Sequence, residues 1–517
     1  MAPSASIAHA RRGKEESPLR LHAARPWTVA LAPAAVLALV CLIASPPAGD
    51  LAAATYRSDL FARVGFSSWD TGWYAAHGYW LASYSLLSPG LGALLGVRLL
   101  LALSALAASV LFALIVERVL PRGAARASAV VFALAVSVGM LSGRVPFDLG
   151  AAIALAAVLA LLEEHVAIAL ALAAACGATS PVAGTFLALA GAAGAAGAWW
   201  TGATSDRRES PRAHARPAAA GAAAAGAMRA TDDRSTAGAL WCTALTAAAL
   251  APVLILSLAY PNGGYEPFVA SAFWPQLAAA ALIALLLPRG PLSKRAHASL
   301  RAGAALYALA LTAAYAIHTP MGGNAARLGP LLGPALLVGV LWPAAFAPTA
   351  TAPPPSRRRH ARALLAGLVL PLLYWQLATP IKDYVAIAGD PAVKASYYAP
   401  LLAELRRLTL GRPTIVEVPL TKAHWESAYL PWHDGVRLAR GWERQLDTRY
   451  AALFYRPTLT AAAYRAWLAS NRVRYVALPD AKLDSAGARE GALIARGVPY
   501  LRESWRSAHW RLYRFEG

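Results

Sequence analysis

The sequence has few charged residues and few cysteines for its length. Charged residues make up 15% of the 517 residues, and the mean hydropathy is +0.45. Because soluble domains carry about 25% charged residues, this composition excludes an ordinary soluble protein and indicates a polytopic membrane protein. The three cysteines, Cys41, Cys176 and Cys242, lie in apolar segments without CxxC or Cys/His spacing. This placement argues against a disulfide framework or a structural zinc site.

Acidic residues are also scarce, so the formal net charge is +21. A strongly basic chain can bind nucleic acid. Here, however, the basic residues fall in short clusters between apolar runs, which is the pattern that orients a protein in a membrane. We therefore predict a membrane-lipid environment and no nucleic-acid partner.

Long apolar runs define a membrane domain. A helix needs about 20 apolar residues to cross a bilayer. By this criterion we predict a cytoplasmic basic N-terminus at 1–26, with no cleaved signal peptide, and a transmembrane domain at 27–379. The eleven predicted spans are 27–45, 97–116, 127–142, 147–162, 166–179, 182–200, 237–259, 269–287, 303–318, 328–347 and 363–379.

The segments that connect the spans differ sharply in positive charge. Those on the side of the N-terminus hold 22 lysines and arginines, whereas those on the other side hold four. Because positive residues favour the cytoplasmic side, we predict a cytoplasmic N-terminus in the inner (plasma) membrane and an extracytoplasmic C-terminal domain. The loop 201–236 is rich in Ala, Gly and Arg, and we predict that it is a disordered cytoplasmic loop.

Residues 380–517 contain no apolar run long enough to span a membrane. Their mixed periodicity predicts a small extracytoplasmic α/β domain. The predicted elements are helices at 397–408 and 459–470, strands at 414–420 and 472–480, and a terminal hairpin at 500–515. Within this domain, 424–455 is dense in Trp, His, Arg and acids, but it has no nucleophile elbow, HExxH or glycine-rich phosphate loop. Its aromatic residues fit either carbohydrate recognition or packing onto the membrane domain.

The extracytoplasmic loop 46–96 holds most of the polar and aromatic residues of the first half of the chain. Amphipathic rings prefer the membrane interface, so the loop is predicted to lie along one membrane face. Asp59 is the candidate general base for an acceptor hydroxyl, and the alternative is a solvated residue paired to Arg57 or Arg63. Asp70, in WDTGWY, is a second catalytic candidate, and the aromatic rings that flank it either stack on a sugar or anchor the loop.

Two further residues of this loop and one extracytoplasmic turn are candidates for substrate contacts. His77, in YAAHGYW, fits a phosphate contact or a hydrogen-bond donor, and no second His lies at metal-ligand spacing. Tyr84, in ASYSLLSPG, fits an interfacial anchor or a substrate contact. In GRVPFDLG, Arg144 and Asp148 form either a salt bridge or part of a polar pocket, because charges at membrane depth need a partner or a cavity.

Two other extracytoplasmic turns complete the set of candidates. The sequence HTPMGGNAARLGP places Asn324 and Arg327 beside a Gly-Gly turn. The Arg327 guanidinium either clamps a lipid-linked phosphate or contacts a lipid headgroup. Tyr265 and Glu266, in PNGGYEPF, are peripheral candidates.

The arrangement as a whole resembles the GT-C superfamily of integral membrane glycosyltransferases and the bacterial membrane proteins related to it. The resemblance rests on the cytoplasmic N-terminus, the eleven spans, the C-terminal α/β domain and the motifs YRSDLFARVGF, WDTGWYAAHGYW and YSLLSPGLGALLG within residues 56–96. It implies transfer of a sugar from a polyprenyl-phosphate donor to a saccharide or lipid acceptor, with Asp59 as the base. A divalent cation is the one candidate cofactor. Because the acids at 50, 59 and 70 do not form the adjacent pair common in this superfamily, we predict no metal ligand.

Two other functions fit the same architecture. A transporter or flippase for lipid-linked saccharides predicts ionisable groups at mid-bilayer, and the middles of the predicted spans lack Asp, Glu and Lys. A non-catalytic envelope assembly protein would keep the architecture without the chemistry. We expect a membrane glycosyltransferase in preference to either.

Overall fold

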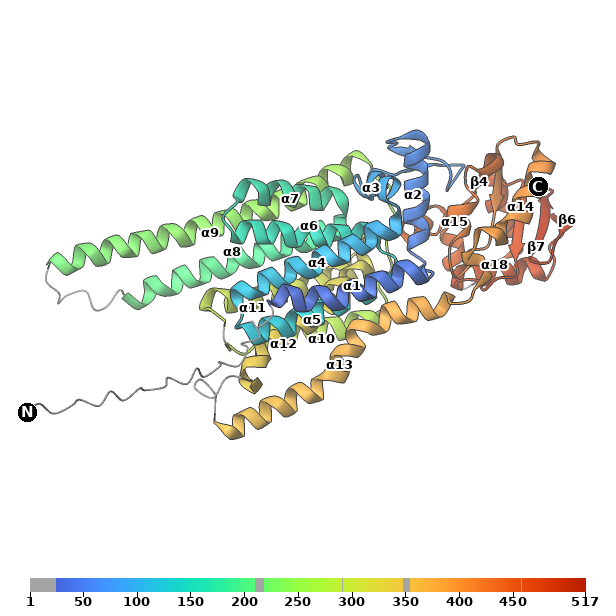
Figure 1. The fold of residues 1–517 in the computed structure, drawn as a ribbon. Coiled ribbons are helices and arrows are strands. Elements are labelled where there is room, and N and C mark those ends of the chain that lie inside the picture. The colour runs from blue at the N-terminus through green and yellow to red at the C-terminus, as the bar shows by residue number, and fades with distance from the viewer. Residues whose placement is uncertain (1–24, 210–217, 291, 347–353, 457) are drawn as a thin grey trace, which may run out of the picture.

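The computed structural model describes residues 25–209, 218–290, 292–346, 354–456 and 458–517. It consists of a long helix bundle with a smaller α/β domain at one end, which we call the domain end (Figure 1). A helix occupies each of the eleven positions that were predicted to span the membrane. These helices are α1 (Pro26–Ala44), α4 (Val97–Val119), α5 (Arg122–Gly139), α6 (Val145–Leu162), α7 (Val166–Thr179), α8 (Pro181–Glu209), α9 (Ala218–Ala259), α10 (Ala270–Leu286), α11 (Lys294–Ala316), α12 (Leu328–Phe346) and α13 (Pro355–Ile387).

The bundle has the length and composition of a multi-pass membrane domain. Within the part of the chain that the structure describes, eight helices are long and apolar enough to cross a membrane, and α7 and α10 are shorter apolar helices. Large apolar side chains such as Leu258 and Leu285 are 81% and 71% exposed, as expected for residues that face lipid. Small residues allow close helix contacts; a methyl group added to Gly184 would lie 2.7 Å from the Cα of Gly177.

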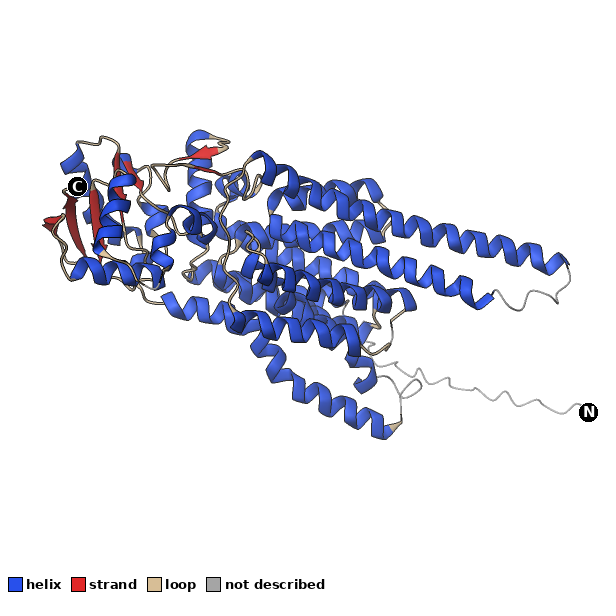
Figure 2. Ribbon diagram, turned by 180° about the vertical axis from the view of Figure 1, so that it is seen from behind, coloured by secondary structure: helices blue, strands red, loops and turns tan. Residues whose placement is uncertain are grey.

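The segment 201–236 differs from its prediction. The structure describes helix over 201–209 and 218–236, and residues 210–217 lie outside the described residues. Alanine has the highest helix propensity, so the same composition that lacks core-forming side chains also favours helix. In Figure 2, α8 and α9 run side by side and project from the bundle, away from the domain end.

The first long loop folds into its own small elements at the domain end. Helix α2 (Leu51–Val64) lies across the end of the bundle in Figure 1, and α3 (Ser88–Leu95) lies beside it. Between them, β1 (Trp69–Asp70) and β2 (Tyr79–Trp80) form a short antiparallel ribbon. Both helices end at a glycine with positive φ, 74° at Gly65 and 83° at Gly96, a conformation that glycine adopts at little cost.

The C-terminal domain contains a five-stranded mixed sheet with the strand order β4-β3-β5-β7-β6. Strand β3 pairs in parallel with β4 and β5, β7 pairs antiparallel with β5, and β6 closes a terminal hairpin with β7. The strands are β3 (Thr414–Glu417), β4 (Val436–Leu438), β5 (Tyr475–Pro479), β6 (Leu501–Arg506) and β7 (Trp510–Phe515), and the helices are α14 (Ala395–Thr409), α15 (Glu426–Tyr429), α16 (Arg444–Tyr450), α17 (Ala461–Ser470) and α18 (Ser485–Ala495).

The predicted fold class is therefore confirmed: a helical polytopic domain is followed by a small α/β domain. Figure 2 shows the strands gathered at the domain end. The apolar side chains of Val416, Leu438, Val476 and Leu512 are at most 2% exposed and form the interior of the sheet. Helix α13 continues through residue 380 and ends at Ile387, just before this domain.

Candidate functional site

Helix α2 separates the candidate residues of the first loop onto opposite faces. Positions two residues apart on an α-helix point about 200° apart. Arg57 accordingly faces the interior, with 5% of its surface exposed, whereas Asp59 is exposed. Among the described residues, Asp59 has no hydrogen-bond or ion-pair partner, and it lines neither the hollow between α2 and residues 81–89 nor the one beside Cys41 and Arg98. Partial burial raises the pKa of Asp59 above its usual value, and the charge of Arg63 opposes this shift.

Arg57 joins the first loop to the C-terminal domain. Its Nη2 donates to Oε1 of Glu443 at 2.6 Å. Its guanidinium carbon lies 4.0 Å from the ring centre of Tyr84 and 5.5 Å from that of Trp73, in the range of cation–π contacts. Two roles are predicted for Arg57 from its place in the first loop, a partner for Asp59 or a direct substrate contact. The structure instead pairs Arg57 with Glu443 of the C-terminal domain.

Asp70 is buried and holds the loop together. Its Oδ2 accepts a hydrogen bond from the hydroxyl of Tyr56 at 2.6 Å, and its Oδ1 accepts from the N–H of Gly72 at 3.0 Å. The indole of Trp432 in turn donates to the Tyr56 hydroxyl at 3.0 Å. With 3% of its surface exposed, Asp70 is an anchor of this turn.

Backbone pairing extends this connection. The N–H of Leu438 donates to the carbonyl of Gly72, and the N–H of Ala75 donates back to the carbonyl of Leu438. Trp73, fully buried, donates its indole N–H to the carbonyl of Ser427. Residues 72–75 therefore lie along β4, and the first loop forms part of the surface of the C-terminal domain.

Arg144 connects three segments at the domain end. It pairs with Asp50 at 3.3 Å and with Asp383, near the end of α13, also at 3.3 Å. The predicted salt bridge between Arg144 and Asp148 is wrong, because Asp50 and Asp383 occupy the guanidinium instead. Asp148 is 7% exposed, and its Oδ2 has no hydrogen-bond partner among the described residues. The alternative, that these residues belong to a polar pocket, stays a prediction.

A group of charged residues gathers where the bundle meets the C-terminal domain. We call it the interface cluster, and electrostatic interactions link its members. It consists of Asp50, Arg144, Asp148, Glu266, Arg327 and Arg444.

Arg327 and Glu266 belong to the members of this cluster whose side chains form no hydrogen bond or ion pair with a described residue. Arg327 is part of the short helix η2 (Gly322–Arg327); within the described ranges it has no hydrogen bond or ion pair, and its guanidinium lies 5.5 Å from the ring centre of Phe147. The Glu266 carboxyl likewise forms no hydrogen bond or ion pair with a described residue. Burial raises the pKa of Glu266 to about 7, although the charges of Arg444 and Arg327 favour its ionised form.

Tyr84 lies between Arg57 and the interface cluster. Burial raises the pKa of the Tyr84 phenol to about 12, and the charges of Arg57 and Arg327 both act to lower it. Tyr84 thus interacts with Arg57 on one side and with Arg327 of the interface cluster on the other. Two other candidates lie apart from this group. His77 is exposed and stacks on Tyr450 with ring centres 4.8 Å apart. The backbone N–H of Asn324 donates to the carbonyl of Met321, the residue before η2.

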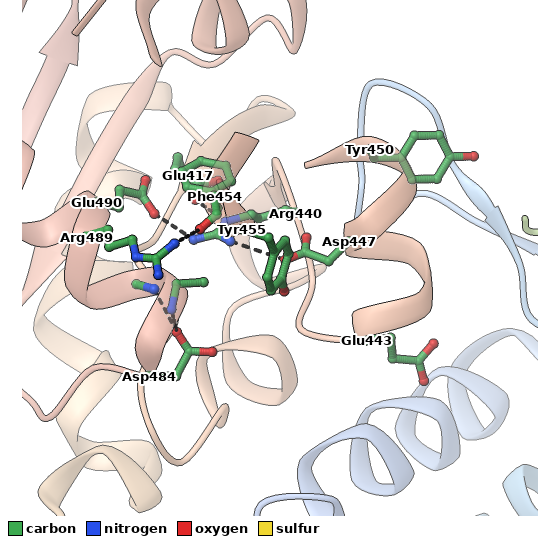
Figure 3. Close-up of polar contacts among 12 residues, drawn as sticks. Glu417, Arg440, Glu443, Asp447, Tyr450, Phe454, Tyr455, Asp484, Arg489 and Glu490 are labelled. Carbon is green, nitrogen blue, oxygen red and sulfur yellow. Dashed lines mark hydrogen bonds and ion pairs between the residues drawn. The ribbon is translucent and has the colours of Figure 1, made fainter. Parts of the chain in front are cut away.

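A second ionic group lies inside the C-terminal domain. Arg440 is fully enclosed and pairs with Glu490 at 2.6 Å, with Glu417 at 2.8 Å and with Asp447 at 3.3 Å (Figure 3). Burial raises the pKa of Glu417, of Glu490 and of Asp447, the last to about 6. A single guanidinium surrounded by three carboxyls explains why protons are retained there. Since all four side chains are 0% exposed, we assign this group to the interior of the domain.

The divalent cation suggested by the family resemblance was tested against the residues present. Over the described ranges, no group of three or more His, Cys, Asp or Glu side chains could hold a metal ion. The acids of the interface cluster instead face arginines. We therefore derive no step through a metal.

Sequence reasoning missed Glu443, Asp383 and Arg444. Glu443 meets Arg57 across 386 positions of the chain, and no local pattern reveals a contact at that separation. Asp383 lay beyond the predicted end of the last span at 379, where the apolar run stops, whereas α13 continues to Ile387. Arg444 belongs to the aromatic and charged segment 424–455, for which packing onto the membrane domain was one of two predicted roles.

Fold and site together define a multi-pass membrane protein with a charged interface between its helix bundle and a C-terminal α/β domain. No protein-family model and no curated protein matches the chain. Among solved structures, it is similar to the oligosaccharyltransferase of Archaeoglobus fulgidus, with 13% identity and a TM-score of 0.48, over 94% of this chain and 74% of that one. That structure holds a tethered acceptor peptide with an NVT sequon. This degree of similarity does not establish a shared family or activity.

Proposed function

We propose that the protein is a membrane glycosyltransferase that takes a sugar from a lipid-phosphate carrier, and that the interface cluster is its active site. The observation that carries the proposal is the pair formed by Arg327 and Glu266. Arg327 has a guanidinium without an ionic partner, and Glu266 has a carboxyl that titrates near neutral pH. Both residues lie at the domain end of the apolar bundle, where Tyr265, next to Glu266, contacts Thr448 of the C-terminal domain.

The pair supplies what the transfer needs. As an acceptor hydroxyl forms its bond to the anomeric carbon, the bond from that carbon to the carrier phosphate breaks. The Glu266 carboxylate takes the hydroxyl proton, and a general base is most effective when its pKa lies near the working pH. Arg327 faces the negative charge that remains on the departing lipid phosphate. Displacement in line would invert the anomeric centre.

This proposal assigns the base differently from the sequence, which favours Asp59. Asp59 lies on the exposed face of α2, opposite Arg57. Glu266 interacts electrostatically with Arg327, whereas Asp59 interacts with Arg63 and His433. We retain Asp59 as the alternative base, and the two assignments are separable by experiment.

The experiment measures transfer from radiolabelled polyprenyl-phosphate sugars by the purified chain in nanodiscs. We expect Glu266→Gln to lower kcat by about 10²- to 10⁴-fold, the usual contribution of a general base. The wild-type rate should rise with pH through about 7 and then level off, because Glu266 must be ionised to act as base. Removing the titrating group should abolish that dependence.

Asp59→Asn is the matched control, since it removes a carboxylate of the same region without touching the interface cluster. We expect it to keep kcat within a factor of two. Loss of transfer in Asp59→Asn with full activity in Glu266→Gln would return the role of base to Asp59. Vesicle experiments in which the chain moves lipid-linked saccharides across the membrane, with no transfer detected, would instead support the flippase.

A further inference from the structure

Helix α16 joins the C-terminal domain to the loop of the bundle that carries Glu266. Three of its residues, Gln445, Thr448 and Arg449, follow the spacing i, i+3, i+4 and therefore share one side of the helix. This side contacts the loop 261–266, which connects α9 to α10. We call these three residues the α16 face.

Thr448 forms the central contact of the α16 face. Its Oγ1 accepts a hydrogen bond from the backbone N–H of Tyr265 at 2.9 Å. The carbonyl oxygens of Tyr265 and Gln445 lie 3.0 and 2.9 Å from the same hydroxyl, whose single proton serves one of them at a time. The residue directly before Glu266 is thus bonded to the C-terminal domain through its main chain.

The loop depends on the α16 face for its path. Gly263 and Gly264 have positive φ angles of 69° and 72°, and glycine is the residue with the greatest conformational freedom. Arg449 restrains this segment by donating from Nη1 to the backbone carbonyl of Asn262. A methyl group added to Gly264 would lie 1.7 Å from the carbonyl oxygen of Gln445, so the loop lies directly against the helix.

Glu266 itself is held from the side of the bundle. Its backbone N–H donates to the carbonyl of Thr319 at 3.1 Å. Gly322 packs so closely that a methyl group there would lie 1.8 Å from the carbonyl oxygen of Glu266. The main chain of Glu266 is therefore fixed between the 319–322 turn and the residue bonded to α16.

The opposite side of α16 is anchored inside the C-terminal domain. Asp447 is fully enclosed and pairs with Arg440 at 3.3 Å (Figure 3), and Leu446 is 2% exposed. Because these side chains are locked in the interior, the α16 face has a fixed position on the domain. Contacts made by this face transfer that position to the loop.

We infer that Thr448 and Arg449 are positioning residues for Glu266, and that the C-terminal domain thereby completes the active site of the helix bundle. This role rests on the proposed function, in which Glu266 is the base. A base acts only within hydrogen-bond reach of the proton it takes, and a misplacement of about 1 Å can lower the rate by about 10²-fold.

The transfer assay compares Thr448→Val with Thr448→Ser. Valine has nearly the shape of threonine but no hydroxyl, so we expect kcat to fall on the order of 10-fold. Burial raises the pKa of Glu266 to about 7; a released loop would admit water, so the midpoint of the rate should move to lower pH. Serine keeps the hydroxyl and should restore both kcat and the midpoint.

Thr409→Val is the matched control in the same domain. The Thr409 hydroxyl is buried and bonds to the carbonyl of Leu405 within α14, away from the α16 face. Loss of this hydroxyl should leave the kcat and the pH midpoint of transfer as in the wild type. A shift of the midpoint in Thr409→Val equal to that in Thr448→Val would make the effect a general loosening of the domain and overturn the inference.

Two measurements on the full chain in nanodiscs do not depend on transfer. Amide hydrogen exchange of residues 262–266 should become about 5- to 10-fold faster in Thr448→Val, the usual contribution of one hydrogen bond. Infrared titration of the Glu266 carboxyl, assigned by its loss in Glu266→Gln, should show the lower midpoint directly. Arg449→Ala changes an exposed residue and should also speed exchange in this loop, which keeps the test if the valine variant fails to fold.

The outcomes separate the positioning role from the proposed function. Transfer that requires Glu266 but is unchanged in Thr448→Val and Arg449→Ala would retain the function and overturn the inference. A lower kcat that serine does not restore, with exchange and titration as in the wild type, would also overturn it. Faster exchange and a shifted Glu266 titration in a chain that transfers no sugar would retain the positioning of Glu266 and lose the proposed function.

Discussion

At the scale of single residues, Asp70 shows how burial decides the role of a carboxylate. In the sequence it stands among aromatic residues, as a sugar-binding or catalytic acid would. In the structure both of its oxygens accept hydrogen bonds from the protein, from Tyr56 and Gly72. A carboxylate whose acceptors are occupied in this way orders the turn around it.

We therefore predict that Asp70→Asn weakens the first loop and leaves the chemistry intact. The amide can still accept from Gly72, but its NH₂ group cannot accept the Tyr56 hydroxyl, and an unmade buried hydrogen bond costs about 1–3 kcal/mol. Hydrogen exchange of residues 66–80 should become faster, while the pH dependence of any transfer stays unchanged.

Tyr56→Phe is the companion variant, because it removes the other end of the same hydrogen bond. Both substitutions remove the same hydrogen bond, so the double variant should lose about as much stability as either single variant. The two effects should therefore not add. Full additivity of the two losses of stability would contradict the shared hydrogen bond. A large loss of kcat in Asp70→Asn without faster hydrogen exchange in residues 66–80 would restore a catalytic role for Asp70.

Individual roles were only partly predictable from the sequence. The sequence places Arg327 in an extracytoplasmic turn because it lies beside a Gly-Gly pair. Arg144 and Asp148 are predicted to interact because charged residues at membrane depth need a partner or a cavity. Their partners were not, because Asp383 is 239 positions from Arg144 along the chain. Charge is visible in a sequence, but pairing depends on the fold that brings the partners together.

At the scale of elements, the first loop and β4 form one connected structure. Residues 72–75 exchange backbone hydrogen bonds with Leu438, and the fully buried Trp73 fills the contact. Gly441 makes this packing feasible: a methyl group there would lie 2.9 Å from ring carbons of Trp73. A contact so short requires one of the two groups to move.

The prediction is that Gly441→Ala loosens the first loop from the C-terminal domain. Because Trp73 is enclosed and cannot move away freely, overpacking should cost about 1–3 kcal/mol. Protection against amide hydrogen exchange should decrease in residues 69–80 and in β4 to a similar extent. Limited proteolysis within the loop should become faster. Gly139→Ala is the control, since a methyl group at Gly139 meets no atom within 4 Å; similar loosening in both variants would contradict the prediction.

The elements themselves were the most predictable part of the molecule. Apolar length located all eleven bundle helices, and the change of period located α14, α17, β3, β5 and the terminal hairpin. The short β1–β2 ribbon and α2 were not predicted within the first loop, because a 14-residue helix with a buried guanidinium on one face has no simple apolar pattern. The loop is ordered by the C-terminal domain it contacts.

At the scale of the whole molecule, acids held in buried positions connect stability to pH. Burial raises the pKa of Asp447 to about 6, against the opposing charge of Arg440, and raises that of Glu266 to about 7. Asp484 behaves in the opposite way: burial disfavours its charge, but His424 and the N–H of Gly487 lower its pKa to about 2. Asp447 and Glu266 therefore add stability to the folded chain in mild acid. Asp484 adds stability that is lost only as the pH falls toward 2.

The sign follows from which state holds the proton. Between about pH 4 and 7 the folded chain keeps protons on Asp447 and Glu266 that the unfolded chain has released, so stability falls as pH rises through this window. Two pKa units correspond to about 3 kcal/mol per group as an upper value. We expect the apparent Tm of the full chain in detergent to be higher at pH 5 than at pH 8, and to fall again as pH drops toward 2, where Asp484 is protonated.

Variants assign the effect to its source. Asp447→Asn removes one titrating group and should flatten the decline between pH 5 and 7, whereas Asp434→Asn, which alters an ion pair with Arg406 at the surface, should leave the slope as it is. A Tm that rises from pH 5 to pH 8 would mean that Asp447 and Glu266 are ionised at little cost in the folded chain. Glu266 would then lack the neutral-range titration that its proposed role as a base requires, and the transfer rate would show no step near pH 7.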